Sequence, residues 1–314
     1  MTNFLEQLPL QPRRSAGQSL LTLLFIAFLG VFLAQFIALL TALPFFGFDI
    51  ARIYDVMTDP TGDPAAHNIL LFIQGVSSLL AYGVFPYFFL RSVEHQPFSA
   101  VSPKWGLSPI PVMLTIGILY TFLVVDARVI EWNANLNFPP ELETSLRQME
   151  DTAMVATKVI TDMNGIGDFL IVLLVIAVIP ALVEEFLFRG LIQNYLHRLS
   201  GNPHVAIWIA ALIFSAVHLQ FYGFIPRVLL GALFGYLFYY SGNLSVPILA
   251  HFLNNGFSLV LVYVMGDEVI EGTDGGPEKL PWSFTIVALV GLIILFYYFR
   301  GYHRKQNMSH GELG

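Results

Sequence analysis

Eleven apolar residues follow one another without a break in Phe169-Leu-Ile-Val-Leu-Leu-Val-Ile-Ala-Val-Ile179, directly ahead of Pro180. A membrane-spanning β-strand alternates apolar and polar residues, and this run does not. An α-helix satisfies its backbone hydrogen bonds internally, so a run of this kind can lie in hydrocarbon as a helix. The run therefore predicts an all-α membrane protein.

The composition extends this interpretation to the whole chain of 314 residues. Hydrophobic residues make up 56% of it and charged residues only 12%, whereas about a quarter of a soluble domain is charged. We expect one polytopic membrane domain over residues 1–314, surrounded by the lipid bilayer, with about eight transmembrane helices. The expected spans are roughly 17–43, 68–90, 109–126, 168–189 and beyond, 204–220, 225–241, 246–265 and 282–300.

Charge and cysteine content exclude several classes of function. The net charge of −7 and the pI of about 5.5 argue against a nucleic-acid partner, because nucleic-acid binding needs a basic face. The chain has no cysteine. Disulfides, thiolate nucleophiles, iron–sulfur clusters and cysteine zinc sites are therefore excluded.

The basic residues predict the orientation of this integral membrane protein, which would lie in the cell membrane if its source is a bacterium. If the N-terminus is cytoplasmic, nine of the fifteen basic residues fall on the inner side, in agreement with the positive-inside rule, and 17 of the 22 acidic residues fall outside. An even number of spans also places the C-terminus in the cytoplasm. The inner basic residues are Arg13, Arg14, Arg91, Lys104, Arg189, Arg198, Arg300, Arg304 and Lys305, and the inner acids are Glu6, Glu94, Glu184, Glu185 and Glu312.

One long connection, at about 127–167, contains an expected amphipathic helix. After Pro139-Pro140, apolar residues recur at steps of four and three, which is typical of a helix with one apolar face. We expect this helix to lie against the membrane or to cap the bundle, and a role in admitting substrate is the alternative. The recurring residues are Leu142, Leu146, Met149, Ala153, Ala156 and Ile160.

Ionisable residues inside apolar spans cost roughly 2.5 kcal/mol or more each, so they mark candidate functional sites. Glu184 and Glu185 are adjacent, so on a helix they point about 100° apart and cannot do the same work. Glu185 and Arg189 have the i, i+4 spacing that favours an ion pair. This pairing leaves Glu184 as a candidate general base. The alternative is that both acids bridge to Arg189, Arg198 or Arg227 and only lock helices together.

Three further polar side chains follow within the apolar segments of residues 168–265. His218 closes one segment, and His251 and Asn255 lie one turn apart on the same face of a later helix. Each of them alone is explained as well by a hydrogen bond between helices. Together with Glu184 they supply a base, an imidazole and two hydrogen-bond donors for an oxyanion, so we expect a polar active site inside the bundle.

Three motifs in this region resemble those of a known family. In order and spacing, Glu184-Glu185-x-x-x-Arg189, Phe214-x-x-x-His218 and His251-x-x-x-Asn255 are similar to the motifs of the CPBP intramembrane proteases, which include the type II CAAX prenyl endopeptidases and bacteriocin-processing or immunity-related (Abi-type) relatives. The resemblance covers about 168–265. It implies an eight-helix fold and hydrolysis of a peptide bond in the membrane. It also implies that Glu184 with His218 activates water, that His251 and Asn255 stabilise the oxyanion, and that Glu185 and Arg189 support the site.

The resemblance leaves the cofactor and the substrate open. Glu184, His218 and His251 could instead be three zinc ligands around a water, which would make a metalloendopeptidase. No His-Glu-x-x-His stretch is present, so we favour a glutamate-dependent hydrolase without a required metal. The expected substrate is a peptide or protein, with a membrane-tethered one as an option. The alternatives are a catalytically silent immunity or partner-binding protein and a transporter, and the lack of internal repeats argues against the transporter.

Overall fold

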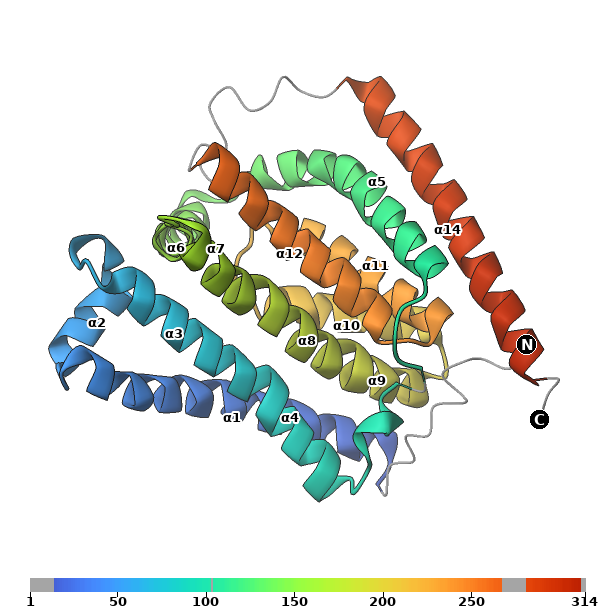
Figure 1. Cartoon of the computed structure of the whole chain (residues 1–314), viewed down its shortest axis with the longest axis horizontal. Helices are drawn as coiled ribbons and strands as arrows, with labels where there is room; N and C mark the ends of the chain where they lie inside the picture. Colours follow the sequence, from blue (N-terminus) through green and yellow to red (C-terminus); the bar gives the residue numbers. More distant parts are fainter. Residues whose placement is uncertain (1–13, 103, 267–280, 312–314) are drawn as a thin grey trace.

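The computed structural model describes residues 14–102, 104–266 and 281–311, and all of its regular elements are helices (Figure 1). Seven helices in these ranges are long and apolar enough to cross a membrane, so the expectation of an all-α polytopic membrane protein is confirmed. The spans are formed by α1 (Ala16–Ala42) with η2 (Leu43–Phe46); α3 (Ala66–Ser78), η4 (Leu79–Val84), α4 (Phe85–Phe88) and η5 (Phe89–Val93); α5 (Pro109–Ala134); α7 (Ile166–Leu173), η7 (Leu174–Val178), α8 (Ile179–Glu185), η8 (Phe186–Ile192) and α9 (Gln193–Ser200); α11 (Phe224–Ser241); α12 (Ser245–Met265); and α14 (Trp282–Gly311).

The shorter elements connect or cap these spans. They are α2 (Ile50–Thr58), η3 (Pro60–Gly62), η6 (Phe98–Ala100), α6 (Pro140–Ile160) and α10 (Pro203–Ala216).

The expected eighth span, 204–220, is not a continuous transmembrane helix. It is replaced by α10, which has 14 residues and is therefore about 21 Å long, short of the roughly 30 Å of a bilayer core. The helix ends at Ala216, and Leu219 then takes a positive φ of 56°, which a helix does not allow. The irregular segment 217–223 carries the chain on to α11. The described residues thus contain seven helices long and apolar enough to span, with α10 as a shorter apolar helix, where about eight spans were expected.

The chain nevertheless continues toward the opposite end of the bundle after α10. Asn133, next to the end of α5, is hydrogen-bonded to the backbone of Phe221 and Ile225, so the start of α11 lies level with the end of α5. The start of α1 and the end of α14 lie at one end of the bundle (Figure 1). Which side of the membrane that end faces stays a prediction. Glu6, Arg13, Glu312 and positions 267–280 lie outside the described residues.

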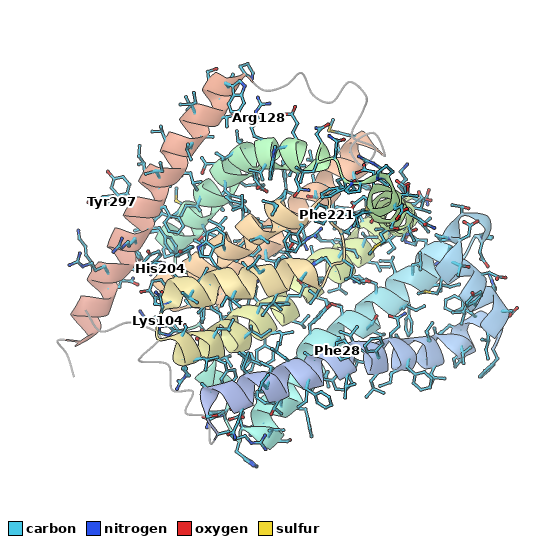
Figure 2. The ribbon with its side chains drawn as sticks, turned by 180° about the vertical axis from the view of Figure 1, so that it is seen from behind. Phe28, Lys104, Arg128, His204, Phe221 and Tyr297 are labelled. Atoms are coloured by element: carbon cyan, nitrogen blue, oxygen red, sulfur yellow. The ribbon has the colours of Figure 1, made fainter. Side chains whose placement is uncertain are left out.

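The distribution of side-chain sizes suits a bundle surrounded by lipid. Buried positions of α1 include the small residues Gly30, Ala34 and Ala38, whereas its large side chains such as Phe28 are exposed. Tyr297 of α14 points away from the bundle (Figure 2). Small residues at helix interfaces let backbones approach closely when lipid, and not water, is the solvent.

The residues after Pro139 form the helix α6, and its expected place outside the membrane stays a prediction. It is seen almost end-on in Figure 1, so it runs across the direction of the spanning helices. Its C-terminal turn packs against α3, where the Val159 carbonyl contacts Nδ1 of His67 at 3.0 Å. Leu142 and Met149 of the expected apolar face are exposed. Whether α6 lies on a membrane or admits substrate stays a prediction.

Candidate active site

Glu184 and Glu185 end α8, within the long helix that runs from Ile166 to Ser200. The π-helical segment η7 precedes α8, and the π-helical segment η8 begins directly after Glu185. Local π-helical turns inside α-helices occur frequently at functional sites. Pro180, near the start of α8, has no N–H and interrupts the helical hydrogen bonding further. Both carboxylates therefore lie on a short stretch of regular helix between two irregular ones.

Glu185 and Arg189 form the ion pair that their spacing predicts. Nη1 of Arg189 donates to Oε1 of Glu185 at 2.8 Å, and both side chains are at most 1% exposed. Nη2 of Arg189 donates to the Gly231 carbonyl at 2.8 Å. The charge of Glu185 is thus neutralised inside the bundle, which a buried carboxylate requires.

Two aromatic rings and a glycine complete the environment of Arg189. Its guanidinium lies 4.7 Å from the ring centroid of Phe214 and 5.3 Å from that of Phe234, within cation–π range. A Cβ at Gly231 would lie 3.2 Å from Cβ of Ala211, so glycine allows the close approach of α11 that brings its carbonyl to Arg189. Sequence reasoning missed Gly231 and Phe234. The spacing Gly231-x-x-x-Gly235 in an apolar helix was the signal that could have indicated this close packing.

His251 is joined to the same carboxylate, a contact that the motifs did not predict. Its Nδ1 lies 2.8 Å from Oε1 of Glu185, and because a carboxylate accepts only, Nδ1 carries the proton in this bond. The imidazole stacks on Phe234, with ring centroids 5.2 Å apart. Glu185 therefore orients His251 as well as neutralising Arg189.

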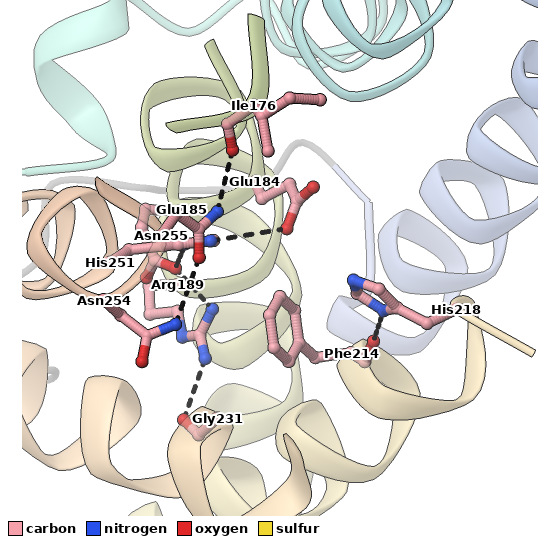
Figure 3. A network of polar contacts seen from close by, with 10 residues as sticks. All are labelled: Ile176, Glu184, Glu185, Arg189, Phe214, His218, Gly231, His251, Asn254 and Asn255. Atoms are coloured by element: carbon pink, nitrogen blue, oxygen red, sulfur yellow. Dashed lines mark hydrogen bonds and ion pairs between the residues drawn. The ribbon is translucent and has the colours of Figure 1, made fainter. Parts of the chain in front are cut away.

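Glu184 differs from its neighbour in accepting no hydrogen bond among the described contacts. Its side chain is 11% exposed, and Nε2 of His251 lies 4.0 Å from its Oε2, an ion-pair contact that is longer than a hydrogen bond (Figure 3). Across residues 14–102, 104–266 and 281–311, no group donates a hydrogen bond to this carboxylate. The structure thus separates the two glutamates into one that is hydrogen-bonded and one whose contact with His251 is long.

His218 lies on the opposite side of Glu184 from His251 (Figure 3). Its Nδ1 lies 2.9 Å from the Phe214 carbonyl oxygen, and Nδ1 must be the donor because a carbonyl only accepts. Nε2 of the neutral ring therefore keeps its lone pair. The Phe214 ring separates the two imidazoles, with its centroid 5.2 Å from that of His218 and 6.0 Å from that of His251. His218 is near Glu184 but makes no direct contact with it among the interactions described.

Asn255 has a partner that explains its position on α12. Its Nδ2 donates to the Ile176 carbonyl at 3.0 Å, and its Oδ1 accepts from Nδ2 of Asn254 at 3.1 Å. Ile176 lies four residues before Pro180, which cannot donate the usual helical hydrogen bond to that carbonyl. Asn255 therefore satisfies a carbonyl that the proline leaves without its helical donor. One hydrogen of its amide remains for a further acceptor.

The zinc hypothesis is not supported by this arrangement. Among the residues whose positions are described, no three His, Asp or Glu side chains are grouped closely enough to hold a metal ion. The Phe214 ring stands between the two imidazoles of His218 and His251. The described residues therefore give no support to a metalloendopeptidase.

Comparison with known proteins gives matches over this region of the chain. Residues 166–257 match the family described as Type II CAAX prenyl endopeptidase Rce1-like. The Uncharacterized protein YpbD of Bacillus subtilis is 33% identical over 110 residues, covering 33% of this chain and 53% of that protein. The Membrane-embedded CAAX protease MroQ of Staphylococcus aureus is 34% identical over 102 residues, covering 31% of this chain and 40% of that protein. The aligned part is thus about half or less of either relative's length. No solved structure matches the chain.

The different environments of the two glutamates predict different effects on stability. Glu185→Gln removes the charge that neutralises Arg189 and should lower the free energy of unfolding by about 3–5 kcal/mol, because a buried charge is left unpaired. Glu184→Gln removes a buried carboxylate that accepts no described hydrogen bond, so it should leave the free energy of unfolding unchanged or raise it. Unfolding of both variants in mixed detergent micelles measures the difference. Equal losses would contradict the assignment of the ion pair to Glu185.

The bond from Asn255 to Ile176 predicts an energetic coupling with Pro180. Asn255→Ala should destabilise the protein less when Pro180→Ala is also present, because the new backbone N–H can satisfy the Ile176 carbonyl. A double-mutant cycle of unfolding free energies should show a coupling of about 1 kcal/mol. Additive effects of the two substitutions would show that Asn255 does not compensate for the proline.

Proposed function

We propose that this protein is an intramembrane endopeptidase that hydrolyses a peptide bond with a glutamate-activated water, because residues 166–257 match the family described as Type II CAAX prenyl endopeptidase Rce1-like. The observation that carries the proposal is the Glu184 carboxylate, which accepts no described hydrogen bond, lies 4.0 Å from Nε2 of His251 and adjoins the neutralised Glu185 (Figure 3). An ionisable group inside a membrane bundle is costly, and a carboxylate that accepts no hydrogen bond gains little to offset that cost.

Glu184 is the general base of the proposed reaction. Its carboxylate takes a proton from water, and the resulting hydroxide oxygen forms a bond to the carbonyl carbon of the substrate peptide. His218 assists this step, since Nε2 of the neutral ring is a lone-pair acceptor on the same side of the site. The proton then passes to the amide nitrogen as the carbon–nitrogen bond breaks, giving a carboxylate and an amine.

His251 and Asn255 stabilise the negative oxygen of the tetrahedral intermediate. Asn255 offers the second hydrogen of its amide, and His251 offers Nε2–H when the ring is protonated at both nitrogens. The Nδ1 proton is already held by Glu185. Glu185 and Arg189 act indirectly, by fixing the ring of His251 and the position of α11.

The substrate is proposed to be a peptide or protein held at the membrane. Glu184 lies inside a helix long enough to cross the bilayer, so a scissile bond must come to it from a chain that can enter the apolar bundle. A membrane-tethered chain meets this requirement.

Cleavage of tethered peptides tests the proposal. Purified protein in lipid vesicles is incubated with a library of N-terminally acylated peptides, and products are identified by mass spectrometry. Glu184→Gln should lower the rate by about 10²–10⁴-fold. Glu131→Gln, a glutamate of α5 paired with Arg128, is the matched control and should cleave as the wild type does. Absence of cleavage by folded wild-type protein, or equal cleavage by the Glu184 variant, would contradict the proposal and leave a catalytically silent protein.

The same cleavage assay tests whether hydrolysis requires a bound metal ion. Treatment with a strong chelator, followed by its removal, should leave the rate unchanged, because the described residues give no support to a metal site. Loss of activity that added zinc restores would contradict this mechanism.

A further inference from the structure

The segment that carries His218 is irregular backbone between two helices of the bundle. Positions 217–223 follow the end of α10 at Ala216 and precede α11, which begins at Phe224. Irregular backbone at membrane depth has peptide groups without helical partners, and these must be satisfied by other parts of the protein. The position of His218 therefore depends on what binds this segment.

One side chain from a distant helix binds the segment at two points. Nδ2 of Asn133 donates to the Phe221 carbonyl at 3.1 Å, and Oδ1 of Asn133 accepts from the backbone N–H of Ile225 at 3.0 Å. Asn133 lies near the end of α5, some 90 residues earlier in the chain, and is fully buried. Its amide uses both a donor and an acceptor, a pattern that an asparagine side chain provides and an apolar residue does not.

Neighbouring contacts also hold this turn: Nδ1 of His218 donates to the Phe214 carbonyl of α10, and the Arg147 guanidinium of α6 lies 4.6 Å from the Tyr222 ring centroid. Oγ of Ser215 donates to the Phe224 carbonyl at 2.7 Å, a bond within the turn itself. The Phe138 and Phe221 rings meet edge to face at 4.9 Å, which is a contact without hydrogen-bond direction. The two bonds of Asn133 are therefore the directional link, among the described contacts, between this turn and α5.

We propose that Asn133 is a positioning residue that holds the 217–223 segment so that the His218 imidazole faces Glu184. The inference rests on the proposed function for the role of His218. Asn133 lies outside residues 166–257, so the proposal assigns part of the site to the region N-terminal to the family match. No sequence motif indicated Asn133.

The experiment compares Asn133→Ala and Asn133→Asp with a matched control, Asn135→Ala. Asn135 lies two residues further on, is exposed, and donates only to the Glu131 carbonyl of its own helix. Cleavage of the acylated peptides by Asn133→Ala should fall by about a hundredfold in kcat with KM nearly unchanged, because a misplaced catalytic group affects the chemical step. The control should match the wild type.

The aspartate variant gives a readout that general loss of stability would not produce. Aspartate keeps an acceptor for Ile225 N–H, but its ionised carboxylate cannot donate to the Phe221 carbonyl. Its rate relative to wild type should rise as the pH is lowered from about 8 to about 5, where a protonated carboxyl regains a donor. A ratio that stays flat with pH, or Asn133→Ala activity equal to that of the wild type, would overturn the proposal.

A measurement without peptidase activity separates this inference from the proposed function. The rate at which diethyl pyrocarbonate modifies His218 is followed by mass spectrometry, with exposed His95 as an internal reference. In Asn133→Ala, modification of His218 should change several-fold while that of His95 does not. If the wild type cleaves no peptide but this change is seen, the hydrolase proposal fails and the positioning stands. If His218 reacts identically in both proteins, the positioning fails whether or not peptides are cleaved.

Discussion

The site depends on one ion pair buried in an apolar bundle, the contact between the guanidinium of Arg189 and the carboxylate of Glu185. Neither charge could remain in this environment alone, because each loses its hydration. Together they fix three helices: Glu185 lies at the end of α8, its carboxylate orients His251 of α12, and Arg189 binds the Gly231 carbonyl of α11. Glu184 accepts no hydrogen bond in this arrangement, because Arg189 and Nδ1 of His251 are bound to its neighbour, while Nε2 of His251 lies 4.0 Å from its Oε2.

The sequence predicts the part of this arrangement that a single helix determines. The i, i+4 spacing of Glu185 and Arg189 and the 100° between adjacent residues are properties of helix geometry, so the separation of the two glutamates was predictable and the ion pair is confirmed. The bond between His251 and Glu185 joins residues 66 positions apart and depends on how α12 packs on α8, which no local pattern encodes. The same limit left the zinc alternative open in the sequence, because convergence of three ligands is a property of packing and not of residue type.

The irregular parts of the fold were the least predictable and lie closest to the candidate site. The hydropathy pattern predicts a span over 204–220, because this run is largely apolar. In the structure, α10 ends at Ala216 and a non-helical segment follows. Pro180 similarly frees the carbonyl of Ile176, which Asn255 then binds. In both places a polar side chain from another helix satisfies backbone groups that the local chain leaves open, Asn133 in one and Asn255 in the other. In the sequence Asn133 is an isolated polar residue, and the carbonyl that Asn255 binds is visible only in the structure.

An experimental structure of the Glu184→Gln protein with an acylated peptide bound tests the central claim most directly. The account predicts that the scissile carbonyl lies between position 184 and the His218 ring, with its oxygen toward Nε2 of His251 and the amide of Asn255. The bonds from Glu185 to Arg189 and to His251 should be unchanged. A peptide bound away from position 184, or a His251 ring turned away from Glu185, would contradict it.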